Sequence, residues 1–203
     1  MKLFDGGMAP NPRRVRIYLA EKGIEVPLEA VDMGALEHRN PKVATRNPLK
    51  SLPVLELDDG TILTESIAIC RYFEELHPEP PLFGTTPLER AQVEMWQRRI
   101  EMHFFLPTAH AFRHTHPAMK EWEKPQIEEW GEANRDRVRR YLRLLDADLD
   151  GRAFLVGDRF SVADITAMVA AGFMKPAKIT MPDDLPNVVR YIETLQSRPS
   201  YKA

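Results

Sequence analysis

Four short apolar stretches within the first third of the chain are bounded by polar or turn residues, which predicts four short strands. One of them, residues 26–31, also shows the apolar and polar alternation of a strand. The stretches are residues 2–5, 26–31, 53–57 and 61–64. Pro27 has no N–H to donate to a neighbouring strand, so we expect the second strand at an edge of the sheet. Asp59-Gly60, between the last two strands, is typical of a β-hairpin turn.

Helical spacing of apolar residues separates and follows these strands. It predicts helices over residues 12–22 and 66–76 and a weaker helix over 38–45. Pro12 suits the first position of a helix, where its missing N–H costs nothing, and Asn11 just before it is a good N-cap. Gly23 is expected to end this first helix.

The second part of the chain shows helical spacing only. Thr86-Pro87-Leu88-Glu89 predicts a capping box that starts a long helix, which Pro107 must kink or end. Further helices are expected over 125–149 and 186–197. Ser161, with Asp164 three residues later, indicates another helix start.

Strands followed by helices in separate blocks indicate two domains. Residues 77–86, HPEPPLFGTT, are rich in proline and have the composition of a linker. We therefore expect an α/β domain over residues 1–77, a linker over 78–86 and an all-helical domain over 87–203.

Charge and composition exclude several functional classes. Lys and Arg number 28 and Asp and Glu 30, so the net charge of −2 offers no basic field for nucleic acid or an anionic membrane. No stretch reaches the roughly 18 apolar residues of a membrane span, and the N-terminus lacks an apolar signal core. A cytoplasmic protein is therefore expected. The single cysteine, Cys70, excludes an internal disulfide and a zinc site built from several cysteines.

Four local motifs occur in order along the chain. They are Gly7-Met8-Ala9-Pro10-Asn11, Asn47-Pro48-Leu49-Lys50-Ser51-Leu52-Pro53-Val54, Thr64-Glu65-Ser66 and Phe160-Ser161-Val162-Ala163-Asp164. With these motifs at these spacings, the sequence resembles the cytosolic glutathione transferases over nearly its whole length. The resemblance implies a thioredoxin-like N-terminal domain that binds glutathione and an all-α C-terminal domain. It is less specific for the reaction, because one fold hosts many chemistries.

Two of the motifs are suited to binding a peptide. Leu52 and Pro53 begin a strand, and a cis peptide bond there would turn the Leu52 backbone groups outward to pair with a bound peptide. The resemblance implies a cis bond and pairing with the cysteinyl part of glutathione. Glu65 and Ser66 stand at a helix start, where free N–H groups favour a carboxylate. The resemblance assigns the carboxylate of the γ-glutamyl group to Ser66 and its ammonium to Glu65. The alternative is that these residues only cap the helix.

The glycyl carboxylate is harder to assign. In theta-class members, which the Asn-Pro-Leu-Lys run resembles, a histidine and a lysine hold this group. Here His38 and Ser51 stand at those positions, with Arg39 and Lys50 nearby. The alternative for His38 is a solvated surface histidine.

The usual thiol-activating residue is absent. Aligned on the first helix, Ala9 takes the position of the theta and zeta serine, and Asn11 that of the beta-class cysteine. An amide cannot act as a base, but Asn11 can donate an N–H to a thiolate, and a helix N-terminus also lowers a thiol pKa. The alternative is that Asn11 only caps the helix.

Cys70 lies within a helix and is expected to be a small buried hydrophobe. His103, His110, His114 and His116 cluster in sequence, but no acidic or cysteine ligand joins them, so no metal site is predicted. Met8, Phe105, His110 and Phe112 are expected instead to line a pocket for an apolar co-substrate.

The sequence thus predicts a glutathione transferase that promotes thiolate attack on a small apolar electrophile bound between the two domains. A homodimer is expected from the resemblance and from the amphipathic helix 88–106, which carries Trp96 and Ile100. One alternative is a glutathione-dependent peroxidase or disulfide reductase, and another is a non-catalytic glutathione-binding or scaffold protein. Isomerisation of the zeta type is disfavoured because the zeta serine-cysteine run is missing.

Overall fold

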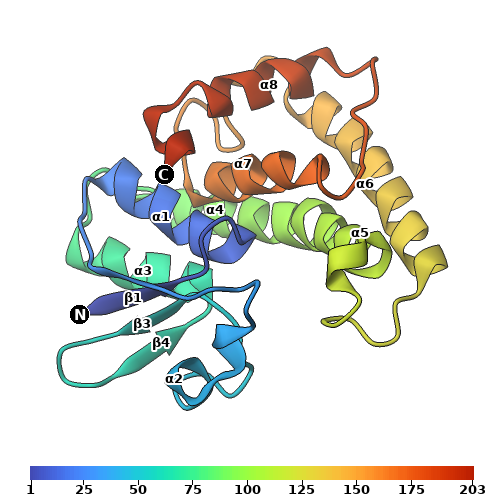
Figure 1. Ribbon diagram of the computed structural model, residues 1–203. Coiled ribbons are helices and arrows are strands. Elements are labelled where there is room, and N and C mark those ends of the chain that lie inside the picture. Colours follow the sequence, from blue (N-terminus) through green and yellow to red (C-terminus); the bar gives the residue numbers. More distant parts are fainter. The chain divides into compact units, whose positions relative to one another are not determined.

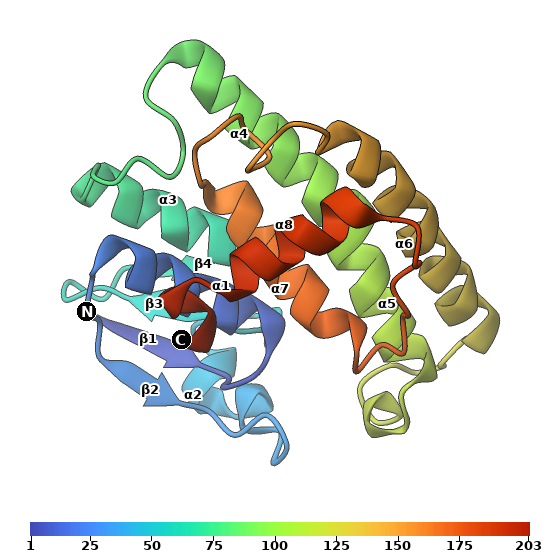
Figure 2. The ribbon, with the colours of Figure 1, turned by 90° about the horizontal axis from the view of Figure 1, so that it is seen from above.

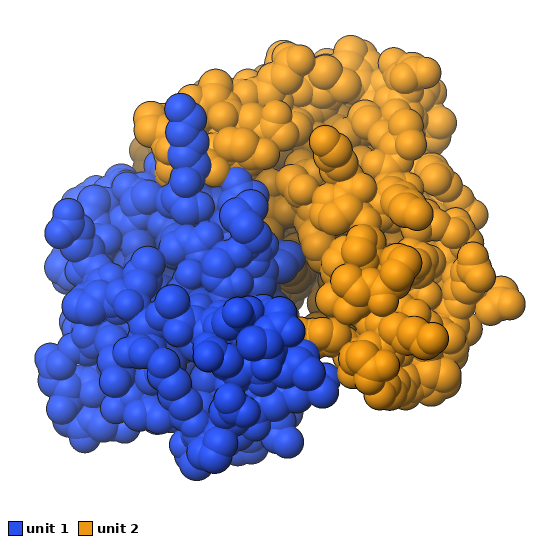
Figure 3. All heavy atoms as spheres, in the orientation of Figure 1, with its two compact units in different colours: residues 1–82, 202–203 blue, residues 83–201 orange.

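The computed structural model describes all 203 residues, and they form two compact units (Figure 3). Unit 1 consists of residues 1–82 with 202–203, and unit 2 of residues 83–201. The division between Leu82 and Phe83 falls inside the proline-rich segment 78–86.

Unit 1 is an α/β unit built on a four-stranded sheet (Figure 1). Its elements are β1 (Lys2–Asp5), α1 (Pro10–Lys22), β2 (Leu28–Ala30), the 3₁₀ turn η1 (Glu37–Arg39), α2 (Pro41–Ala44), β3 (Val54–Glu56), β4 (Ile62–Thr64) and α3 (Ser66–Leu76). The strand order is β2-β1-β3-β4, with β1 and β2 parallel and the other pairs antiparallel. The four strands and the helix over 66–76 confirm the predictions, and β2 lies at the edge that Pro27 indicated.

Helices cover both faces of this sheet. Helices α1 and α3 lie on one face and α2 on the other (Figures 1 and 2). The core of the unit contains Phe4, Val31, Val43, Leu52 and Val54, all nearly inaccessible to solvent. These apolar side chains pack β1, β3 and α2 together. The candidate site residues lie in segments next to these elements.

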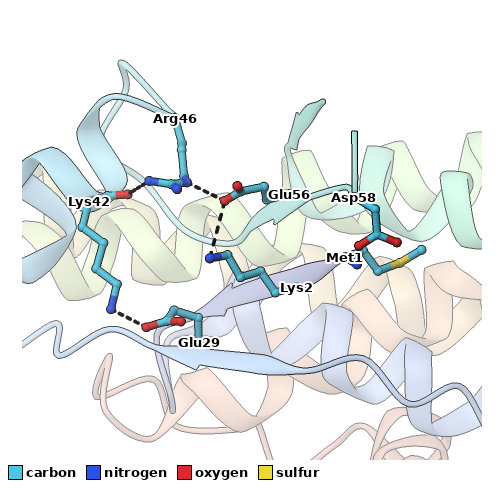
Figure 4. Close-up of polar contacts among 7 residues, drawn as sticks. All are labelled: Met1, Lys2, Glu29, Lys42, Arg46, Glu56 and Asp58. Atoms are coloured by element: carbon cyan, nitrogen blue, oxygen red, sulfur yellow. Dashed lines mark hydrogen bonds and ion pairs between the residues drawn. The ribbon is translucent and has the colours of Figure 1, made fainter. Parts of the chain in front are cut away.

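Ion pairs fasten α2 to the sheet (Figure 4). Arg46, just after α2, donates from Nε to Glu56 of β3 at 2.7 Å, and Glu56 also lies 3.9 Å from Lys2 of β1. Lys42 of α2 pairs with Glu29 of β2. These half-exposed pairs are individually weak, but as a network they fix the position of the segment that joins η1 to β3.

The named secondary-structure elements of unit 2 are all helical, as predicted (Figure 1). Its elements are α4 (Pro87–Ile100), the π-helical segment η2 (Glu101–Phe105), α5 (Leu106–Thr115), the 3₁₀ turn η3 (Pro117–Met119), α6 (Glu128–Asp148), α7 (Val162–Met174), α8 (Pro186–Gln196) and the final 3₁₀ turn η4 (Pro199–Lys202). None of the helices is long and apolar enough to span a membrane.

Local sequence rules explain how two of these helices begin, and a change of winding lies close to a proline. The capping boxes Thr86–Glu89 and Ser161–Asp164 are both formed. Pro107 cannot donate a backbone hydrogen bond, and the π-helical segment η2 ends two residues before it, so that the chain continues from α4 through η2 into α5.

Candidate active site

The strand register brings four loops to one end of the sheet in unit 1. Asp5 of β1 pairs with Ala30 of β2, Phe4 of β1 with Val54 of β3, and Val54 with Thr64 of β4. The carboxyl ends of β1, β2 and β4 therefore lie beside the amino end of β3. This end of the sheet adjoins the segments that carry Asn11, His38, Leu52-Pro53 and Glu65-Ser66.

The loop after β1 is held in a defined shape. The Asp5 carboxylate accepts hydrogen bonds from the Gly7 N–H at 3.0 Å and from the Arg16 guanidinium. Arg16 also donates from Nη1 to the Gly7 carbonyl at 2.8 Å, and Gly7 has a φ of 59°. These bonds fix the approach to α1, while Met8 extends into solvent with 80% of its surface exposed.

Helix α1 begins two residues earlier than predicted. Its first residue is Pro10 and its N-cap is Ala9, so Asn11 is not the N-cap and that alternative is wrong. Two prolines suit a first turn, and the backbone turns helical at the earlier one. Pro10 and Pro12 have no N–H, and Arg13 donates its N–H to the Ala9 carbonyl at 3.1 Å. The first turn therefore presents one main-chain donor, that of Asn11, whose side chain is exposed.

Asn47 organises the turn that leads into β3. It is 3% exposed and donates from Nδ2 to both the carbonyl and the hydroxyl oxygen of Ser51, at 2.9 and 3.0 Å. Its Oδ1 accepts the Leu49 N–H at 3.1 Å, which fixes the orientation of the amide. Because the Ser51 hydroxyl oxygen accepts from Asn47, its own proton is directed elsewhere. Ser51 is exposed, so this proton can be donated to a ligand.

The Leu52–Pro53 peptide bond is cis, which confirms the prediction. The Leu52 side chain is buried in the core of the unit. Its backbone lies outside the β3 ladder and makes no backbone hydrogen bond within the chain. Leu52 therefore offers one unpaired main-chain unit next to a strand, as pairing with an extended peptide requires.

His38 is not a solvated surface residue, because it is 2% exposed. Burial, and secondly the charge of Arg39, hold the pKa of His38 below its usual value. The ring is therefore neutral at pH 7 and is suited to donate one N–H rather than to supply a positive charge. Lys50 directly precedes Ser51 in the sequence and is exposed, so it is the nearest cation to that serine along the chain.

Glu65 and Ser66 differ sharply in environment. Glu65 is exposed and has φ 65° and ψ 116°, a backbone conformation that residues other than glycine rarely adopt. Strain of this kind costs on the order of 1–3 kcal/mol and is concentrated at functional sites. Ser66, the first residue of α3, is 4% exposed. Its hydroxyl oxygen accepts a hydrogen bond from Arg14 Nη1 at 2.9 Å.

Sequence patterns do not indicate the contact that Arg14 makes with Ser66. Arg14 lies on α1 and is 1% exposed, and its partner Ser66 is 52 positions away. The only local signal is its place on the helix, one turn before the buried Tyr18.

One hydroxyl group, that of Tyr18, and one thiol group, that of Cys70, are unsuited to activate the thiol of a ligand. The Tyr18 hydroxyl donates to Glu74 at 2.5 Å, and burial raises the Tyr18 pKa further above its ordinary value. Cys70 is fully buried, as predicted, and burial raises the pKa of its thiol. Within residues 6–11 there is no serine, tyrosine or cysteine.

The other predicted site residues lie on α5 and η2 in unit 2. Phe105 is 4% exposed, and Phe112 packs against Phe173 with ring centroids 5.0 Å apart. His110 is half-buried, and burial followed by the charge of Arg113 lowers its pKa. The centroids of the His110 and His114 rings are 6.3 Å apart, and no group of three or more potential metal ligands forms anywhere in the chain.

Comparison with known proteins identifies the fold. The model of the glutathione S-transferase N-terminal domain matches residues 9–76, and that of the C-terminal domain matches residues 100–199. Glutathione S-transferase 2 of Saccharomyces cerevisiae is 35% identical over 205 residues, covering 100% of this chain and 88% of the yeast protein. The chain belongs to the glutathione S-transferase family.

Solved structures agree with this assignment. The crystal structure of Gtt2 from Saccharomyces cerevisiae has a TM-score of 0.94 at 35% identity and covers 100% of this chain and 99% of its own. A glutathione S-transferase domain-containing protein from Marinobacter aquaeolei has a TM-score of 0.94 at 36% identity and covers 99% and 100%. These matches confirm the predicted fold class and show a glutathione S-transferase enzyme.

Proposed function

We propose that this glutathione S-transferase binds glutathione at the loop end of the sheet in unit 1 and promotes attack of its thiolate on a small apolar electrophile. The observation that carries the proposal is the strained backbone of Glu65 followed by the buried Ser66 at the start of α3. Such strain persists only where the surrounding structure maintains it. A helix start with free N–H groups favours a carboxylate.

Each of the three residues of glutathione has its own proposed contacts in unit 1. Ser66 donates its hydroxyl proton to the α-carboxylate of the γ-glutamyl group, and the Glu65 carboxylate faces the ammonium. The Leu52 backbone pairs with the cysteinyl unit. Ser51 donates to the glycyl carboxylate, and His38, whose pKa is lowered by burial, acts as a neutral donor at the same group.

Thiolate stabilisation is assigned to Asn11. Its main-chain N–H is the one main-chain donor left in the first turn of α1, and its exposed side-chain amide adds a second. Both lie at the positive end of the helix dipole, which lowers the pKa of a nearby thiol. Proximity of the bound thiolate to the electrophile supplies much of the remaining rate. Met8, Phe105, His110 and Phe112 are the proposed contacts of the second substrate.

A second function is favoured by the absence of a thiol-activating side chain. Tyr18 is engaged with Glu74, and residues 6–11 hold no hydroxyl or thiol group. Among the reductive alternatives, this absence favours a glutathione-dependent disulfide reductase, because a bound disulfide does not require the enzyme to deprotonate its own thiol. The pure scaffold alternative differs from both, because a scaffold need not bind glutathione.

Calorimetry of the wild type and Ser66→Ala tests the binding site. We expect glutathione to bind the wild type and the variant to bind at least about tenfold more weakly, since a hydrogen bond to a charged group contributes roughly 1.5–3 kcal/mol. Ser197→Ala is the matched control, because Ser197 is exposed and its hydroxyl donates only within its own helix end. Unchanged affinity in Ser66→Ala would remove this residue from the site. Assays with an aromatic halide and an organic hydroperoxide then separate transferase from peroxidase.

A homodimer is part of the proposal, but on different residues from those predicted. Trp96 and Ile100 are 4% and 0% exposed, so they belong to the core of unit 2 and cannot form the dimer surface. Met95, Met102 and Leu106 are exposed instead, and the spacing of seven and four places them on one helical face. A symmetric pair would bury this stripe. Light scattering that gives the mass of one chain at micromolar concentration would contradict it. A cytoplasmic location and a role in detoxification are also proposals.

A further inference from the structure

We infer that Arg14 is a positioning residue that commits the Ser66 hydroxyl to the carboxylate of the ligand and supplies positive charge behind it. The inference rests on the proposed glutathione site. Its basis is the buried contact between α1 and α3, in which Arg14 Nη1 lies 2.9 Å from Ser66 Oγ. The two residues are 1% and 4% exposed.

The direction of this hydrogen bond is fixed by chemistry. A guanidinium group has five N–H donors and no acceptor, so Ser66 Oγ must accept. The proton of the Ser66 hydroxyl is then free to be donated to another group. A carboxylate is an acceptor only and is the natural recipient at a helix start. Without Arg14 the hydroxyl would be free to rotate and to accept elsewhere, as serine hydroxyls do.

The charge of Arg14 acts in the same place. A guanidinium is always protonated, and burial weakens the screening of its field by water. The field reaches the next turn of α3, where the Arg14 charge opposes the larger effect of burial on the pKa of the Cys70 thiol. Ser66 and Cys70 are four residues apart and lie on one face of α3. A ligand carboxylate at Ser66 therefore experiences both the helix N-terminus and Arg14.

A purely structural role explains the contact less well. One turn further along the same interface, Tyr18 of α1 donates to Glu74 of α3 at 2.5 Å and already joins the two helices. A buried charge costs more than a well-packed apolar side chain of similar size. A cation at the end of the interface next to the strained Glu65 is suited to recognising an anion.

The test compares two ligands across three variants. Calorimetry measures the affinity of glutathione and of γ-aminobutyryl-cysteinylglycine, which is glutathione without the α-carboxylate. We expect Arg14→Met to weaken glutathione binding by about tenfold or more and to leave the affinity for the analogue nearly unchanged. Arg14→Lys retains a charged donor and is expected to lose less. Tyr18→Phe is the control, since it removes the neighbouring α1–α3 hydrogen bond and should not change the ratio of the two affinities.

The ratio separates positioning from structure. A structural strut would lower the affinity for both ligands alike, and equal losses in Arg14→Met, or no loss, would overturn the inference. If Arg14→Met does not fold, the ratio in Arg14→Lys decides in the same way. If the wild type binds glutathione but Arg14→Met loses affinity for both ligands equally, only this inference is overturned. A wild type that binds no glutathione would overturn the proposed function and this inference with it.

Discussion

Tyr191 of α8 donates its hydroxyl proton to Asp164 of α7 at 2.7 Å, in an environment from which water is excluded. The same Asp164 carboxylate accepts from the N–H and hydroxyl of Ser161 at 2.8 Å each, and from the N–H of Leu155 at 3.1 Å. One side chain therefore closes the capping box of α7 and joins it to α8 and to the preceding loop.

We predict that Asp164→Ala destabilises the protein far more than Tyr191→Phe. The alanine leaves several buried donors without an acceptor, each at roughly 1–3 kcal/mol, so the loss should reach about 3 kcal/mol or more. The phenylalanine removes one hydrogen bond and should cost about 1 kcal/mol. Urea unfolding measures both. Similar losses in the two variants would show that Asp164 matters only through Tyr191.

The second prediction concerns acid sensitivity at the start of α4. Hydrogen bonds from Thr85, and secondly from the N–H groups of Thr85 and Thr86, lower the pKa of Glu89 to about 2. A carboxyl whose pKa is lower in the folded state stabilises the fold above its unfolded pKa of roughly 4.3. That contribution is lost as the pH falls from there toward 2.

Glu89→Gln mimics the protonated side chain and tests this directly. Its melting temperature should lie below that of the wild type at pH 6, and the gap should close as the pH falls below about 4. A gap that stays constant from pH 6 to pH 3 would show that the charge of Glu89 contributes nothing.

The third prediction concerns the close packing of α5 against α6. A Cβ added at Gly131 would lie 2.3 Å from Thr115 Cγ2, which is far inside van der Waals contact. Gly131→Ala should therefore destabilise the protein by about 1–3 kcal/mol, despite the higher helix propensity of alanine. The Thr115 hydroxyl donates to the Ala111 carbonyl and accepts from Arg135.

Thr115→Ser removes the clashing methyl group and retains that hydroxyl. The double variant Gly131→Ala/Thr115→Ser should therefore recover most of the stability lost in Gly131→Ala, and helix propensity should add up to about 1 kcal/mol. Thermal unfolding of the two single variants and the double variant forms a mutant cycle. Additive effects in the cycle would mean that the Thr115 methyl group is not the obstacle.

The structural features that were predicted correctly depend on residues that are close together in the sequence. The capping boxes at Thr86 and Ser161 and the helix over 66–76 follow from rules that span three or four positions. The start of α1 differs from the prediction because Pro10 and Pro12 both satisfy the same local rule, which does not distinguish between them.

The burial of polar residues could not be predicted in this way. Arg14 meets Ser66 across 52 positions, and His38 is buried although it follows an edge strand. Trp96 and Ile100 were expected at a dimer surface but are buried within unit 2. An amphipathic helix does not reveal whether its apolar face contacts its own unit or another copy of the chain. Contacts between distant parts of the chain decide each case.

The fourth prediction is that Cys70 is inert in the folded protein. It is fully buried, and burial raises the pKa of its thiol. A thiol reagent should label no cysteine in the native protein and one after unfolding in urea, since the sequence has a single cysteine. Native labelling at the rate of a free thiol would contradict this. Inertness also means that thiolate absorbance at neutral pH belongs to bound glutathione alone.

The fifth prediction assigns thiolate stabilisation to Asn11. Asn11→Ala removes a donor that favours the thiolate. The pKa of bound glutathione should therefore rise by one to two units, the equivalent of roughly 1.5–3 kcal/mol. Transfer should fall at neutral pH and recover at high pH, where the thiol ionises unaided. A pH–rate profile, with the thiolate absorbance titrated in parallel, measures both effects.

Asn11→Asp provides the sharper test, because it places a negative charge beside the thiolate and should lower the rate further than alanine does. The helix itself should tolerate the change. Asn11 lies inside the first turn, where Ala9 is the N-cap, and an acidic residue there favours the helix dipole. The melting temperatures of both variants should therefore stay close to that of the wild type, which separates loss of catalysis from loss of folding. Full activity in Asn11→Asp would exclude the side chain and leave the main-chain N–H of residue 11 as the stabilising group.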